Sequence, residues 1–251
     1  MKKMIFFAVL AMKIVAYANI ADTVPLASTS REDTLVKGAA SFLNKQNEEV
    51  FPLAKKYGGK DWFFVDIKPE CNINIFSKAG KTCPVKFLFM ETGKRKFYGI
   101  PFDIIPPKDN SNKTAIALPS MQLMTGEIMP TSYTAKIGKT AKVLYILHTA
   151  YYASDGKQNY VVNYGGGSSQ TIEIVKGKNI SDWYHQKDRL YSEDVKYVLV
   201  PAQKGSKTHF RNLHILQWTN PSPNKKVKSI TFNADKKSPM GMFIIAVTGH
   251  E

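Results

Sequence analysis

The chain has 251 residues, of which 43% are hydrophobic, and a formal net charge of +15 at pH 7. Its two cysteines and five dispersed histidines lack the spacing of a zinc site, and no nucleic-acid-binding module is visible, so neither a metal ion nor nucleic acid is expected. After the N-terminus, no segment approaches the roughly 20 apolar residues that a membrane-spanning helix needs.

The N-terminus has the composition of a secretory signal peptide. Two lysines form a basic start, residues 5–15 are apolar, and Ala16 and Ala18 flank the tyrosine of a small-x-small cleavage site. Lys13 interrupts the apolar stretch, which is too short to cross a bilayer. The protein is therefore predicted to be secreted or periplasmic, with residues 1–18 removed.

Residues 19–58 are predicted to form a short N-terminal helical segment. Ser30 and Asp33 have the spacing of a capping box, and the apolar residues that follow recur at helical spacing: Leu35, Ala39, Phe42 and Leu43. The helix is expected to end before Pro52, because proline cannot continue a helix.

The two cysteines, Cys71 and Cys83, are separated by a short polar stretch. In an oxidising compartment this spacing favours a disulfide that closes a short loop, worth about 3 kcal/mol in the chain-entropy model. The alternative is a pair of buried free thiols.

After Gly59 the sequence changes to short runs rich in aromatic and β-branched residues, each bounded by turn residues or lysine. The glycine run at 165–167 lacks the lysine and the following helix of a phosphate-binding loop, and predicts a hairpin. The runs predict an all-β domain over residues 59–251, an antiparallel β-sandwich or jelly roll. The predicted strands are residues 62–67, 85–90, 97–105, 114–118, 132–137, 142–149, 160–164, 171–175, 196–200, 213–218, 227–232 and 242–248.

The run KVLYILHTA, which begins at residue 142, places apolar residues on both faces of a strand. It predicts a central strand, covered on one side by the opposite sheet and on the other by a loop or the N-terminal helix. His148 lies near the end of this strand. It is either a core residue bonded to a nearby carbonyl or part of a cleft at the rim of the sandwich.

Lysines are scattered through the predicted turns and strand edges and form no dense arm. They are interpreted as a solvated basic surface that discourages edge pairing. The alternative is a specific polyanion site, for which an acidic or sulfated polysaccharide is the most sensible ligand in a secreted protein.

The polar loop at residues 177–188 contains adjacent aromatic, acidic and amide side chains. This mixture suits sugar recognition, in which a ring face stacks on C–H groups while carboxylate or amide oxygens hold hydroxyls. Alternatively, the aromatics anchor the loop to the core. Together with residues at the end of the central strand, the candidate ligand-binding residues are Trp183, Tyr184, Asp182, His148, Tyr151 and Tyr152.

No catalytic signature is present, and no catalytic residue or cofactor is predicted. The sequence has no Gly-x-Ser-x-Gly elbow, no His-Glu-x-x-His motif, no P-loop lysine and no recognisable cluster of calcium ligands. A glycosidase needs two carboxylates that face each other roughly 5 to 9 Å apart. No spacing selects such a pair from the available acids: Asp66, Asp103, Asp155, Glu173 and Asp182.

Several blocks of sequence resemble a group of secreted, largely uncharacterised bacterial domains. The blocks are residues 61–72, 98–118, 144–153, 160–184, which includes the pattern Asn-Ile-x-Asp-Trp, and 217–249. Those domains look like galactose-binding-like jelly rolls that accompany glycoside hydrolases. The resemblance implies a carbohydrate-associated β-sandwich and no specific activity.

The sequence therefore predicts a non-catalytic carbohydrate-binding or glycan-associated module. Two alternatives stay open: a hydrolase that acts on polysaccharide through a carboxylate pair, and an interaction or scaffold domain of the cell envelope without a sugar site. The observation expected to discriminate best is whether Trp183 and His148 share one open cleft.

Overall fold

The computed structural model describes residues 49–77, 83–121, 129–156, 158–184, 192–204, 206 and 209–251. The predicted signal peptide and the predicted helical residues before 49 lie outside the described residues. The described α-helix, α2, spans Pro52–Tyr57. Pro52, before which the predicted helix was expected to end, is the first residue of α2, and proline is tolerated there because the first position of a helix needs no hydrogen bond from its backbone nitrogen.

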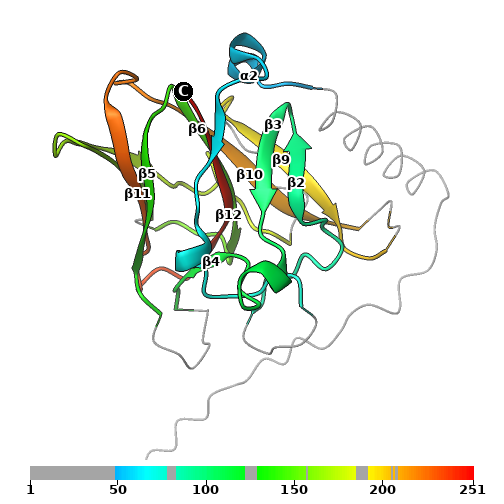
Figure 1. Cartoon of the computed structure of the whole chain (residues 1–251). Coiled ribbons are helices and arrows are strands. Elements are labelled where there is room, and N and C mark those ends of the chain that lie inside the picture. Colours follow the sequence, from blue (N-terminus) through cyan, green and yellow to red (C-terminus); the bar gives the residue numbers. More distant parts are fainter. Residues whose placement is uncertain are drawn as a thin grey trace, which may run out of the picture.

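Two antiparallel sheets form a β-sandwich, which confirms the predicted all-β class (Figure 1). The six-stranded sheet has the order β1 (Trp62–Phe64), β12 (Gly241–His250), β6 (Val143–Tyr151), β10 (Phe210–Thr219) and β9 (Val195–Pro201), with β4 (Ile116–Leu118) also paired to β12. The four-stranded sheet has the order β5 (Ser132–Thr140), β11 (Lys226–Asn233), β7 (Asn159–Tyr164) and β8 (Ser169–Glu173). A separate hairpin joins β2 (Gly93–Phe97) to β3 (Ile100–Ile104), and two short 3-10 turns, η1 (Lys68–Glu70) and η2 (Pro107–Asp109), lie in the connections.

Most predicted strands are present, with two corrections. Residues 83–90 form no strand, because this segment packs on a sheet but pairs with no strand of it. The side chains of Val85 and Phe87 are nevertheless buried. Residues 97–105 were predicted as one strand, but Tyr98 and Gly99 have φ angles of 49° and 81° and turn the chain between β2 and β3. The glycine run forms the predicted hairpin between β7 and β8.

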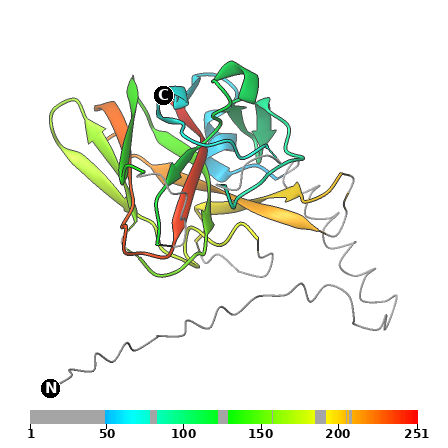
Figure 2. The same cartoon turned by 90° about the horizontal axis from the view of Figure 1, so that it is seen from below.

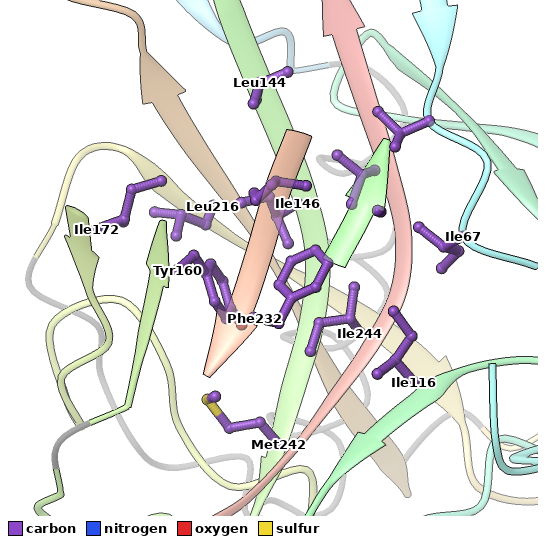
Figure 3. Close-up of a cluster of buried hydrophobic side chains, with 14 of the residues drawn as sticks. Ile67, Ile116, Leu144, Ile146, Tyr160, Ile172, Leu216, Phe232, Met242 and Ile244 are labelled. Carbon is purple, nitrogen blue, oxygen red and sulfur yellow. The ribbon is translucent and has the colours of Figure 1, made fainter. Parts of the chain in front are cut away.

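The strand β6 is central, as predicted, and separates two hydrophobic cores. Leu144 and Ile146 face the space between the two sheets, where they pack with residues of the four-stranded sheet such as Phe232 (Figure 3). Tyr145 and Leu147 point to the opposite face and join a second core. The alternating positions of one strand therefore contribute to both cores, and its residues from Val143 to Ala150 are buried.

The second core is covered by chain that precedes the sandwich. The β2–β3 hairpin, the segments at 73–77 and 83–90, and Phe51 and Ala54 of the α2 region all contribute buried residues to it. In both views the hairpin lies on one side of β12 and the four-stranded sheet lies on the other (Figure 1, Figure 2). The predicted cover, a loop or the N-terminal helix, is thus a hairpin, loops and a short helix together.

The predicted disulfide is absent, because the two cysteines lie in different cores. Cys71 packs in the core between the sheets and Cys83 in the second core, and both thiols are free. The Cys83 thiol donates a hydrogen bond to the carbonyl oxygen of Val85 at 2.9 Å. Burial raises the pKa of each thiol to about 12, so neither is a reactive thiolate near neutral pH.

Adding a reducing agent is expected to leave the thermal midpoint of unfolding unchanged. Thiol titration of the denatured protein, without reductant, should detect both cysteines, whereas the folded protein should react slowly. A disulfide would contribute about 3 kcal/mol, so a clear fall in the midpoint on reduction, with no titratable thiol beforehand, would contradict the structure.

Candidate functional site

His148 lies in the core between the sheets. Its side chain is fully buried, and its Nδ1 is 2.7 Å from the hydroxyl oxygen of Tyr160 on β7. The cross-strand neighbour of His148 on β10 is His214, also fully buried, whose Nε2 is 3.0 Å from Oγ of Ser181. Of the two placements predicted for His148, the structure has the core placement, with a tyrosine hydroxyl as the hydrogen-bond partner.

Both histidines are held neutral by their surroundings. Desolvation lowers the pKa of His148 to about 3. Desolvation, and then the neighbouring His148, lower the pKa of His214 well below its ordinary value. The imidazolium form would lose its water shell in this core, which disfavours the charge.

The contact between Ser181 and His214 has the chemistry of a nucleophile and a base, but its surroundings do not support catalysis. Both side chains have 0% exposure, so a substrate cannot reach them. Among the described residues no carboxylate hydrogen bonds to His214 to orient it as in a catalytic triad. The pair therefore contributes to packing between the sheets and a loop.

The other five predicted residues come together where β6 ends. Asp182 accepts two backbone hydrogen bonds, from the N–H of Ala153 at 3.2 Å and from the N–H of Tyr184 at 2.9 Å. The backbone N–H of Trp183 also donates to the carbonyl of Ala150 at 2.9 Å. One carboxylate thus joins the segment after β6, which carries Tyr151 and Tyr152, to the loop at 181–184, which carries Trp183 and Tyr184.

These aromatic residues differ in exposure. Trp183 is only 8% exposed and packs in the second core, with its ring 6.1 Å from that of Phe87. Tyr152 and Tyr184 are 52% and 54% exposed, while Tyr151 is half-buried. Trp183 is therefore the anchor of the loop. We call the other three residues, Tyr151, Tyr152 and Tyr184, which lie on the two segments that Asp182 joins, the tyrosine platform.

Tyr152 has an unusual backbone conformation. Its φ angle is 52°, in the left-handed region that bulky residues rarely adopt and that costs on the order of 1–3 kcal/mol. Its ring lies 4.5 Å from that of Tyr151 at an interplanar angle of 69°. A strained, exposed tyrosine whose ring lies against the half-buried Tyr151 points to a function at this surface, because strain of this kind gathers at binding sites.

Arg211 on β10 completes the platform, and the sequence analysis missed it. Its guanidinium carbon lies 4.2 Å from the ring centre of Tyr184 and 5.0 Å from that of Trp183. The backbone N–H of its neighbour, Asn212, donates to the carbonyl of Trp183 at 2.8 Å, which fixes β10 against the loop. No sequence signal marks this residue, because a single arginine in a strand acquires its role only when the loop folds over it.

Trp183 and His148 do not share a cleft. Trp183 packs in the second core, whereas the His148 side chain bonds to Tyr160 in the core between the sheets. The six-stranded sheet separates the two side chains. His148 therefore does not join the other candidates, which gather at the tyrosine platform.

An open hollow of about 520 Å³ lies elsewhere, beside Tyr57. Its charged groups are already engaged, since Lys142 donates to the carbonyl of Glu251 at 2.6 Å and the Glu251 carboxylate pairs with Lys139. Asn220, also in its lining, bonds to Tyr164, Ser222 and Ala141. A second hollow of about 410 Å³ lies by α2 and contains two lysines, Lys55 and Lys96. Neither contains any of the five acids considered as catalytic candidates.

Within the described ranges, no three histidine, cysteine or acidic side chains gather closely enough to hold a metal ion. No helix in the part of the chain that the structure describes is long and apolar enough to cross a bilayer.

No protein-family model matches the chain, and a comparison with curated proteins finds no match. The resemblance to galactose-binding-like domains therefore stays a prediction.

Proposed function

We propose that this protein is a non-catalytic glycan-binding module and that the tyrosine platform is its binding surface. The observation that carries the proposal is the pair of exposed rings, Tyr152 and Tyr184, on two segments that the Asp182 carboxylate joins. Export by the N-terminal signal, and kinship with galactose-binding-like jelly rolls, are parts of the same proposal.

The chemistry of the platform suits a sugar chain. Exposed aromatic rings offer flat apolar faces to the C–H groups of a pyranose. Each oxygen of Asp182 accepts one backbone hydrogen bond, and an ionised carboxylate has about four acceptor sites, so lone pairs remain for sugar hydroxyls. With few anchoring rings, the affinity is expected in the micromolar to millimolar range, roughly −4 to −8 kcal/mol.

Binding is supported over hydrolysis by the placement of the reactive groups. The Ser181 and His214 pair is fully buried, and Asp182 is engaged in holding two segments of backbone. The carbohydrate-hydrolase alternative needs two carboxylates that face each other across a cleft, and neither of the two hollows described above is lined by any of the five candidate acids.

Replacing Tyr184 or Tyr152 with alanine is expected to weaken glycan binding by about tenfold each, since about 1.4 kcal/mol of stacking is lost. Affinity electrophoresis in gels that contain plant, algal or animal polysaccharides would first identify a retained glycan, and isothermal titration would then measure the variants. Phe64 is a matched control, because it is an aromatic residue on β1 with 37% exposure and lies outside the platform.

Phe64→Ala is expected to bind like the wild type. Two results would contradict the proposal: no retention by any polysaccharide while the circular dichroism spectrum is native, or equal loss of binding in the Phe64 and Tyr184 variants. The first would favour a scaffold domain without a sugar site.

A further inference from the structure

Arg211 differs from the other arginine in the described part of the chain. Arg95 forms an ion pair with Glu91 at 3.1 Å. Arg211 forms no ion pair with any described residue, and its side chain donates one hydrogen bond within the described ranges, from Nη1 to the carbonyl of Phe210 at 3.2 Å. Asp182, the acid of the same site, bonds to backbone N–H groups and not to Arg211.

The guanidinium of Arg211 is also held in a defined orientation. It lies over the rings of Tyr184 and Trp183, and the Trp183 ring is fixed in the second core. A guanidinium carries five N–H donors, of which the Phe210 carbonyl engages one. A stacked and pre-oriented arginine loses little side-chain entropy when it binds a ligand, and this one retains donors for which no residue in the described ranges supplies an acceptor.

We propose that Arg211 makes the tyrosine platform selective for acidic glycans by binding the carboxylate of a uronic acid residue. This inference rests on the proposed function and names its ligand class. A sugar ring that stacks on the exposed tyrosines would bring its carboxylate beside the guanidinium. The planar fork of arginine matches the two oxygens of a carboxylate, and such charge-assisted pairs are about twice as strong as neutral hydrogen bonds.

The net charge of +15 requires a control for unspecific attraction. Polygalacturonate and its fully methyl-esterified form share one sugar backbone and differ in the carboxylate, so they are the probes of choice. The variants are Arg211→Gln, Arg211→Lys and Arg95→Gln. The Lys variant keeps the charge and removes the fork, and the Arg95 variant removes the same charge at an exposed ion pair outside the platform.

The wild type is expected to bind polygalacturonate about tenfold more tightly than the ester in titration calorimetry at 0.15 M salt. Arg211→Gln and Arg211→Lys should each lose most of this preference while their affinity for the ester changes little. Arg95→Gln should bind both polymers like the wild type. Unfolding midpoints near the wild-type value would show that the variants fold.

Several results would overturn the inference. Equal binding of the acid and the ester by the wild type would do so, as would equal effects of the Arg211→Gln and Arg95→Gln substitutions, which would indicate diffuse charge. Retained preference in Arg211→Lys would exclude recognition by the fork. These outcomes leave the proposed function intact if Tyr184→Ala still weakens binding to the ester. If the wild type binds neither polymer nor any other glycan, the inference and the proposed function are both overturned.

Discussion

Replacing Gly249 with alanine is expected to destabilise the protein by about 1–3 kcal/mol, the usual range for overpacking a core. A Cβ atom at this position would lie 2.1 Å from Cζ of the Phe63 ring and 2.6 Å from both Cε atoms. Phe63 is the cross-strand neighbour of Gly249 on β1 and is 8% exposed in the core between the sheets. The ring covers the glycine directly and cannot move without disturbing that core.

Urea denaturation would measure this effect, with Gly166→Ala as a matched control. A Cβ atom at Gly166, in the turn between β7 and β8, meets no atom within 4 Å, so its substitution should change the free energy of unfolding by less than about 0.5 kcal/mol. In a Phe63→Leu background the cost of Gly249→Ala should shrink, because the smaller side chain leaves room. An unchanged cost in that background would show that the ring is not the cause.

Lowering the pH from about 7 toward 3 is expected to destabilise the protein steeply, in part through His148 and His214. Burial lowers the pKa of His148 to about 3 and also lowers the pKa of His214, while both titrate near 6.5 in the unfolded chain. Between these values the unfolded chain binds more protons than the native state, so stability falls as the pH falls. Each histidine contributes up to about 1.4 kcal/mol per pH unit to the slope.

Urea denaturation at pH 7, 6, 5 and 4 would test this, by comparing the pH slope of the unfolding free energy and not its absolute value. His148→Gln and His214→Gln should each flatten the slope, and the exposed His209 provides the control substitution, His209→Gln. Two variants are used because either one could be too unstable to measure. Slopes equal to that of the wild type in both would mean that other groups dominate acid unfolding.

The strand pattern could be predicted from sequence wherever burial follows a simple period. The apolar residues on both faces of 143–150 predicted a central strand, and the glycine run at 165–167 predicted the β7–β8 hairpin. Residues 85–90 were also predicted as a strand, but they form none. Val85 and Phe87 alternate in burial like a strand, but whether an extended segment finds a hydrogen-bonding partner depends on distant chain that its own sequence does not encode.

The candidate site could be predicted in its parts and not in its assembly. The loop composition predicted Asp182, Trp183 and Tyr184 as candidate residues, but the division into a buried anchor and exposed rings depends on which side of the six-stranded sheet each residue meets. Arg211 and the cross-strand pairing of the two buried histidines depend on strand register, which one sequence does not give. Cys71 and Cys83 are near in sequence but pack in separate cores.

The position of β12 has a consequence for how the protein is made. This strand, Gly241–His250, is the last in the described sequence but lies inside the six-stranded sheet, where it pairs with β1, β4 and β6. The six-stranded sheet therefore cannot close until this segment, which follows all of its partners in the chain, has joined it. Until then the edge of β6 that β12 covers has unpaired backbone N–H and C=O groups, and an open strand edge of this kind is a template for pairing with another chain.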